Sequence, residues 1–135
     1  KKILKLAYLG VPPIMNDLYS YIEERGAKVV FNEVQREFAF PRHVKAKNIF
    51  EQYLNYTYPY GIEFRIKNLE KDLADRDVQG IIHYTQKFCH RALDNIVLKE
   101  KLPYPLLNIE ADREAVLDER TKLRLDAFID MLGDM

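Results

Sequence analysis

The sequence predicts an α/β fold, in which four parallel strands form an open sheet with helices on both faces. Four short apolar runs, at residues 3–9, 27–31, 78–84 and 106–109, have the length and composition of buried strands. Segments with a helical spacing of apolar residues separate these runs. Strands that are joined through helices must be parallel, with right-handed crossovers.

The first strand, at residues 3–9, ends in a loop at residues 10–13. The two prolines of that loop can continue neither a strand ladder nor a helix interior. Asn16 is expected to cap the first helix, which ends at Gly26, a common residue at helix C-termini. The inward stripe of this helix is Leu18, Tyr21 and Ile22, with Ile14 packed before it.

The second strand, at residues 27–31, ends at Asn32 and Glu33. A carboxylate is therefore expected at the edge of the sheet where the strands end. The alternative is that Glu33 is a solvated acid in a loop, which is the commoner situation for glutamate.

Residues 34–60 are the least regular part of the chain. A helix is expected after Pro41, with one face formed by Val44, Ile49, Phe50, Tyr53 and Leu54. Four tyrosines then fall within residues 53–60 and are expected in an ordered loop. These rings can wall a ligand pocket or dock against a partner. The alternative is that they close the edge of the sheet with their hydroxyls in water.

The third strand starts near Val78 and is followed by polar residues and the only cysteine, Cys89. A helix precedes this strand, and its inward stripe consists of Ile62, Ile66, Leu69 and Leu73. A second segment with helical spacing follows the strand, at Ala92, Leu93, Ile96 and Val97. We therefore expect Cys89 in the first turn of the following helix, where the helix amino terminus favours a thiolate. Position alone favours the alternative, a half-buried structural cysteine.

The fourth strand, at residues 106–109, follows a proline-containing turn at residues 101–105. It exits at residues 110–113, which include Glu110 and Asp112. Asp118 is expected to cap the last helix. The inward face of that helix consists of Leu125, Phe128, Ile129 and Leu132.

The simplest strand order is the flavodoxin-like or Rossmann-like order 2-1-3-4. Its switch point lies between the first and third strands, and ligands of such sheets bind outside the carboxyl ends of the strands. Residues 11–13 and 86–90 are expected to face one crevice. The candidate substrate-binding residues are Pro13, Gln86, Lys87 and His90, with Glu33 and Glu110 on the flanks.

The composition indicates a soluble globular protein. The chain has 135 residues, of which 47% are hydrophobic and 31% charged, and this length predicts one α/β domain over residues 1–135. The balance of 21 basic against 21 acidic residues argues against nucleic acid or a membrane surface as a partner.

One cysteine cannot form an internal disulfide, which suits the cytoplasm. The first residue, Lys1, is consistent with a piece of a longer protein.

Several familiar chemistries lack their required residues. No glycine-rich fingerprint follows the first strand, and no phosphate-binding GxxxxGK[ST] loop is present. A receiver-type phosphorylation site would need acids after the first and third strands, and these are missing. A cysteine phosphatase needs an arginine six residues after its cysteine, where this chain has Asn95. One cysteine also excludes a CxxC pair and a self-contained zinc site.

Three stretches of the chain resemble a known family. They are the run from Gly80 to Cys89, the run from Pro105 to Asp112, and the run from Thr121 to Leu132. They are similar to the C-terminal domain of the 2-hydroxyacyl-CoA dehydratase family, which includes the 2-hydroxyglutaryl-CoA dehydratase subunits and is related to benzoyl-CoA reductase. The cysteine after the third strand and the Glu-x-Asp after the fourth are the most specific points of the resemblance.

The resemblance implies a role in radical dehydration of an (R)-2-hydroxyacyl-CoA. In that family a subunit holds a 4Fe-4S cluster through three cysteines, the last of which matches Cys89. An ATP-dependent activator protein delivers one electron to the cluster. This chain lacks the other two cysteines and the preceding N-terminal domain, so the isolated chain is expected to be inactive and to carry no cluster. A second dehydratase subunit is a further expected partner.

An alternative of another class is a flavodoxin-like binding or interaction module that keeps the fold without the chemistry. The two hypotheses differ in whether the chain continues upstream into a segment that contains two further cysteines.

Overall fold

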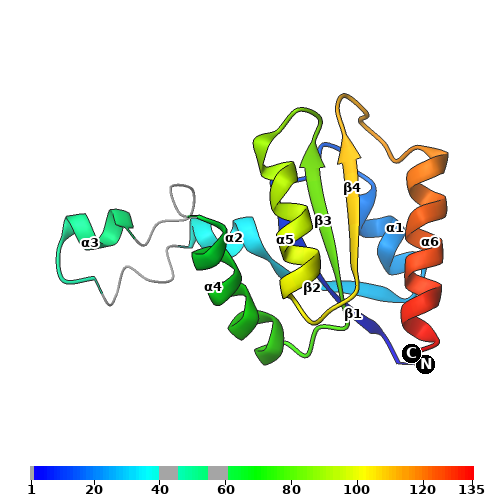
Figure 1. Ribbon diagram of the computed structural model, residues 1–135. Coiled ribbons are helices and arrows are strands. Elements are labelled where there is room, and N and C mark those ends of the chain that lie inside the picture. The colour runs from blue at the N-terminus through cyan, green and yellow to red at the C-terminus, as the bar shows by residue number, and fades with distance from the viewer. Residues whose placement is uncertain (1, 40–45, 55–60) are drawn as a thin grey trace.

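The computed structural model describes residues 2–39, 46–54 and 61–135, and it contains the predicted sheet. The strands are β1 (Leu4–Gly10), β2 (Ala27–Asn32), β3 (Gly80–Gln86) and β4 (Leu106–Ala111). They are parallel and lie in the order β2-β1-β3-β4 (Figure 1). The α/β fold class and the strand order are therefore confirmed.

Helices cover both faces of this sheet. They are α1 (Leu18–Glu24), α2 (Glu33–Phe38), α3 (Ile49–Leu54), α4 (Ile62–Asp75), α5 (Asp94–Lys101) and α6 (Glu119–Gly133), with a short 3-10 helix, η2 (His90–Leu93), before α5. On one face α1 and α6 pack against alternate strand residues such as Leu6 and Ile82. On the other face α4 and α5 pack against Ala7, Leu9 and Ile81. Alternation of buried side chains along each strand thus produces two cores.

The predicted apolar faces of two helices are confirmed. In α4, Leu69 and Leu73 are fully buried, and Ile62 and Ile66 pack beside them. In α6, the four predicted residues Leu125, Phe128, Ile129 and Leu132 are all buried. The Asp118 side chain accepts a hydrogen bond of 2.7 Å from the Thr121 N–H, so the predicted cap of the last helix is also confirmed.

The predicted cap of the first helix was wrong. Asp17, not Asn16, is the residue before α1, and its side chain makes no capping hydrogen bond. Instead the Asp17 carboxylate accepts a hydrogen bond of 2.9 Å from the Leu117 N–H. The Asn16 N–H donates to the Ala115 carbonyl at 3.0 Å. Both residues are thus used to hold the loop that leads into α6.

The segment after β2 also differs from expectation. A helix, α2, begins directly at Glu33, and the Asn32 side chain caps it by accepting from the Gln35 N–H at 3.1 Å.

The helix predicted after Pro41 is present as α3, but Ile49 and Phe50 are 59% and 77% exposed, so its apolar face is not packed against the sheet. In Figure 1, α3 lies away from the sheet. Val44, the Tyr53 side chain and the tyrosines of residues 55–60 lie outside the described residues, as does the expectation about their loop.

The segment after Cys89 is helical, as its spacing predicts, but two of its four spaced apolar residues do not face the core. Leu93 and Ile96 are 70% and 66% exposed, while Leu98 is fully buried in the core on that face. The reason is the 3-10 helix, because its three residues per turn shift the phase of the side chains before α5 begins.

Gly10, the last residue of β1, is required by a close backbone contact. It has a φ of +103°, and a Cβ atom there would lie 2.1 Å from the Tyr84 carbonyl oxygen. We expect Gly10→Ala to lower the free energy of unfolding by about 2–3 kcal/mol, since both the backbone angle and the contact are unfavourable. Urea denaturation measures this change. Gly133→Ala is the control, because a Cβ there meets nothing within 4 Å, and an equal loss in both variants would contradict the argument.

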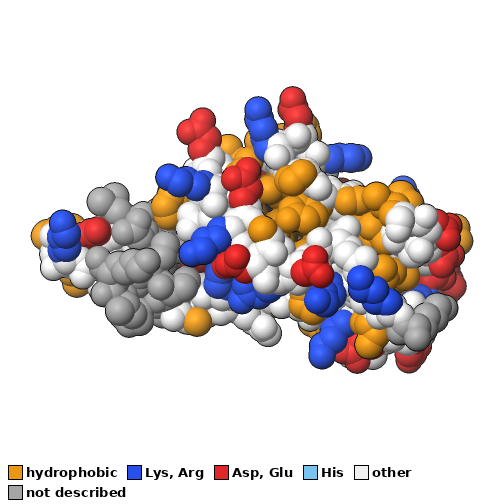
Figure 2. Space-filling view, turned by 90° about the horizontal axis from the view of Figure 1, so that it is seen from below, with side chains coloured by type: hydrophobic (Ala, Val, Ile, Leu, Met, Phe, Trp, Pro, Cys, Tyr) orange, Lys and Arg blue, Asp and Glu red, His pale blue; other side chains and the backbone are white. Residues whose placement is uncertain are grey.

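Charges are distributed without segregation on the face at the amino ends of the strands. Figure 2 shows acidic and basic side chains interspersed there, with apolar side chains between them. Among the described residues, no helix combines the length and apolar character that crossing a bilayer requires.

Candidate functional site

A cavity of about 80 Å³ lies at the carboxyl ends of β1 and β3, which is the switch point of the sheet. Loop and strand residues form one side of it, and α2, α4 and η2 contribute the other. Its lining consists of Gly10, Val11, Glu33, Val34, Arg65, His83, Tyr84, Thr85, Gln86, Cys89 and Arg91. The position agrees with the rule that open α/β sheets bind ligands at this point.

The structure brings together some of the predicted site residues and separates others. Glu33, Gln86 and Cys89 line this cavity, as does Val11 of the predicted loop. Lys87 and Glu110 instead line a second hollow of about 220 Å³, beside the start of α6. Pro13 is half-buried and His90 is exposed, and neither is among the residues that line the two hollows.

Glu33 is not a solvated acid but half of a buried ion pair. Its Oε2 atom accepts from Arg65 Nε at 2.8 Å, and its Oε1 atom accepts from Arg65 Nη2 at 2.7 Å. The Gly10 N–H donates to the same Oε1 at 3.1 Å. Glu33 is 4% exposed and Arg65 is also 4% exposed. The prediction of a carboxylate at this edge is therefore correct, and the solvated alternative was wrong.

The Glu33 carboxyl is held in its ionised form. Burial by itself would raise its pKa, but the charge and hydrogen bonds of Arg65, the Gly10 N–H and the Arg36 charge together hold the pKa below its ordinary value. Both carboxylate oxygens are occupied by donors, so this group acts here as an anchor and not as a proton acceptor.

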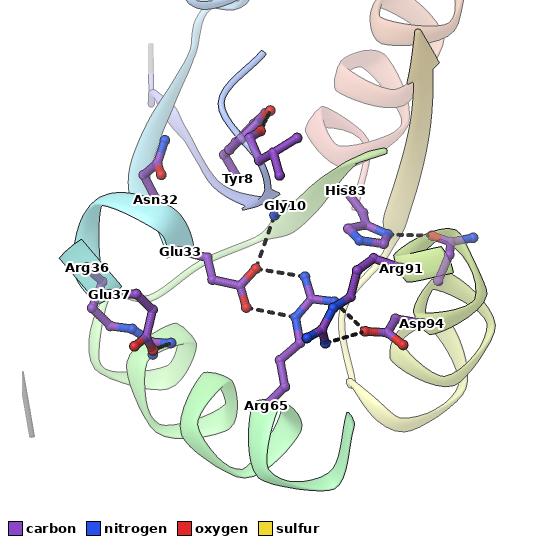
Figure 3. A network of polar contacts seen from close by, with 12 residues as sticks. Tyr8, Gly10, Asn32, Glu33, Arg36, Glu37, Arg65, His83, Arg91 and Asp94 are labelled. Carbon is purple, nitrogen blue, oxygen red and sulfur yellow. Dashed lines mark hydrogen bonds and ion pairs between the residues drawn. The ribbon is translucent and has the colours of Figure 1, made fainter. Parts of the chain in front are cut away.

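The same guanidinium joins a third segment to the site, as Figure 3 shows. Arg65 Nη1 donates to Asp94 Oδ2 at 3.0 Å, and Asp94, the first residue of α5, also accepts from Arg91 Nη1 at 3.4 Å. Arg65 on α4 therefore links the start of α2 to the start of α5. Because η2 lies directly before α5, this network fixes the segment that carries Cys89.

Cys89 is the residue before η2, with an extended backbone (φ −73°, ψ 129°), and its side chain is partly exposed. Its N–H donates to the Gln86 carbonyl at 3.1 Å, and its carbonyl accepts from the Ala92 N–H at 3.0 Å. The predicted strand-to-helix junction is thus correct, although Cys89 precedes the helix and that helix is a four-residue 3-10 turn. The preceding residue, Phe88, has a φ of +65° and a fully exposed ring.

The loop that leaves β1 is fixed from within the sheet. The Tyr8 hydroxyl donates to the Val11 carbonyl, and the Tyr8 ring stacks on Tyr84, with 6.4 Å between ring centroids. Burial raises the pKa of Tyr8, and the neighbouring Tyr19 and Tyr84 raise it further, so the hydroxyl remains a donor. These contacts hold Val11 at the edge of the cavity.

Sequence reasoning missed Arg65, His83, Arg91 and Asp94. Arg65 carried a usable signal, because it falls on the inward face of α4, one turn from Ile62 and from Leu69. His83 carried another, as a polar residue inside an apolar strand. In the described part of the chain, no three His, Cys, Asp or Glu side chains are grouped so that they could hold a metal ion.

Fold and site together define an open α/β domain with a partly exposed thiol beside a cavity at the switch point. A sequence model of the family described as 2-hydroxyglutaryl-CoA dehydratase, D-component, matches residues 1–132. The chain belongs to this family, which confirms the predicted resemblance. A comparison with curated proteins finds no match.

Proposed function

We propose that this chain is the C-terminal domain of a cytoplasmic iron-sulfur subunit that dehydrates an (R)-2-hydroxyacyl-CoA. In this proposal Cys89 supplies one thiolate ligand to a 4Fe-4S cluster. The observation that carries it is the position of Cys89: the single cysteine of a chain in the dehydratase family lines the cavity at the switch point.

The residues present fit one corner of such a cluster. Thiolate is the usual ligand of iron-sulfur clusters, and Cys89 is a partly exposed thiol whose backbone is hydrogen-bonded on both sides. One thiol cannot hold a cluster alone. We therefore propose that the remaining ligands come from a preceding domain or from a second dehydratase subunit.

When bound, the cluster would supply one-electron chemistry, with an ATP-dependent activator protein as the proposed electron source. The chain's own residues would position the reacting groups. The Glu33–Arg65–Asp94 network would keep the Cys89 segment in place, and the ion pair leaves the cavity wall without an unpaired carboxylate. The acyl thioester would then enter beside Cys89.

The iron and sulfide content of anaerobically purified protein tests this proposal. We expect no cluster in the isolated chain, and four irons with matching sulfide in the complete subunit, with the visible absorption of a cluster. An iron-free complete subunit would overturn the proposal and favour a flavodoxin-like binding module. A full cluster in the isolated chain would contradict the shared ligand set.

A further inference from the structure

Helix α6 carries a second apolar row, on the face that points away from the sheet. Every fourth residue there is apolar and exposed, and the members of this row are Leu123, Ala127 and Met131. Leu123 and Met131 are 70% and 45% exposed. Figure 1 shows α6 at the side of the molecule, with no other described helix outside it. A surface helix normally has polar residues opposite its core face, so the outer row indicates a further contact surface.

The charges beside this row are segregated along the helix. Bases occur in its first half and acids at its carboxyl end, and these four exposed residues are Arg120, Arg124, Asp130 and Asp134. This order is opposite to the one that the helix dipole favours, because the dipole stabilises acids at the amino end and bases at the carboxyl end. The ion pairs that α6 forms with described residues use Lys122 and Asp126 instead. The four charges are therefore available to a partner.

The two pairs of charges are placed symmetrically about Ala127. Arg124 and Asp130 are each three residues from it, and Arg120 and Asp134 are each seven residues from it. Residues three and seven apart lie on one side of a helix, so all four charges share the side that carries Ala127. Ala127 is thus the midpoint of a face whose two halves carry opposite charge.

Such a face is complementary to itself when two copies of α6 run antiparallel. With a two-fold axis at Ala127, Arg124 of each copy lies at the same level as Asp130 of the other. Leu123 likewise lies at the level of Met131, so the apolar rows meet. The small side chain at the axis lets the two helices approach, and a parallel pair would instead bring like charges together.

We propose that this outer face of α6 binds the same face of a second copy of the chain, as an antiparallel helix pair with two-fold symmetry. The apolar rows supply most of the affinity, since exposed ion pairs contribute little, and the charges fix the direction of the pair. A contact through one helix of each copy is small, so a weak dimer with a micromolar dissociation constant is expected. Helix α6 contributes no residue to the cavity beside Cys89, so the inference does not rest on the proposed function.

Sedimentation equilibrium of the 135-residue chain tests the pairing through its charges. Arg124→Asp and Asp130→Arg each place like charges together at two symmetric positions, and each should weaken dimerisation about tenfold. The double variant restores opposite charges and should dimerise like the native chain. An equal mixture of the two single variants should form a heterodimer more tightly than either variant forms a homodimer. Glu70→Lys, an exposed change on α4, is the control and should have no effect.

A second measurement needs no variant. Leu123 and Met131 are about 12 Å apart along one helix, so their methyl groups cannot contact each other within one copy. In an equal mixture of ¹³C-labelled and unlabelled chains, an intermolecular NOE between these methyl groups should appear. A parallel pair would not produce it, because each residue would then lie beside its own equivalent.

A native chain that stays monomeric at about 100 μM would overturn the inference and leave this face to another domain or to solvent. A dimer without the contact between Leu123 and Met131 would also overturn it. The same holds for a dimer that neither charge reversal weakens, because its interface would lie elsewhere on the molecule. Circular dichroism shows whether each variant is folded before its dimerisation is measured.

Discussion

Cys89→Ser in the complete subunit is expected to abolish dehydration and to remove or deplete the iron. The alcohol of serine stays protonated where the thiolate of cysteine can bind iron, so one corner of the cluster would be lost. Loss of one ligand should leave the cluster labile, and activity should fall to the background of the assay. Iron and sulfide analysis, the visible spectrum and dehydration of 2-hydroxyglutaryl-CoA measure these effects under anaerobic conditions.

The neighbouring histidine provides the matched control. His90 is exposed and lies outside the cavity, so His90→Gln should retain both iron and activity. Because Cys89 is the chain's one cysteine, alkylation of the isolated chain with iodoacetamide reports on this thiol alone. A Cys89→Ser subunit with full iron content and full activity would show that Cys89 is only a packed residue.

Arg65→Leu is expected to lower the free energy of unfolding by about 3–5 kcal/mol. The substitution leaves the Glu33 carboxylate buried at 4% exposure without the guanidinium that binds both of its oxygens. It also removes the contact with Asp94, and so loosens the segment that carries Cys89. Urea denaturation followed by circular dichroism measures the loss of stability.

The loss should depend on pH in a defined direction. In the native chain the pKa of Glu33 is lower in the folded than in the unfolded state, where it is about 4.3. The ionised carboxylate therefore stabilises the fold fully at pH values above the unfolded-state pKa. This stabilisation is lost as the pH falls through the lower pKa of the folded state. Without Arg65, burial would raise that pKa, and the variant would lose stability as pH rises above about 4. The difference between native and variant chains should therefore be largest near neutral pH.

Two variants separate the buried charge from a general effect of removing an ion pair. Arg65→Leu combined with Glu33→Gln removes both charges and should recover much of the stability. Asp77→Asn breaks the exposed pair with Lys5, whose atoms are 3.6 Å apart, and should cost less than about 1 kcal/mol. A single Arg65 variant as stable as Asp77→Asn would show that the buried pair contributes little.

The parallel strands and their helices could be predicted from local patterns, and the order 2-1-3-4 was the simplest arrangement of such strands. Apolar runs separated by helical spacing force parallel strands, and Asp118 with Leu125 and Leu132 carried clear signals of a cap and an inward face. The side-chain phase after Cys89 could not be predicted, because a 3-10 turn instead of a full helical turn is not visible in the spacing of Leu93 and Ile96.

The site was predictable in position but not in its connections. The switch-point rule correctly placed Glu33, Gln86 and Cys89 together. It could not supply the partner of Glu33, because Arg65 is 32 residues away and belongs to a helix that reads as an ordinary amphipathic segment. It also could not separate Lys87 from Gln86, although these adjacent residues line different hollows.

The hydrogen bond from the Gly10 N–H to the Glu33 carboxylate links local unfolding at the end of β1 to movement of the Glu33 side chain. The last amide of β1 donates to a side-chain carboxylate that is also bound by Arg65, and α2 begins at that same residue. This amide can exchange its proton with solvent only when the carboxylate moves away. We therefore expect the end of β1, the first turn of α2 and the start of α5 to open as one unit, with exchange of the Gly10 amide proton as its measure.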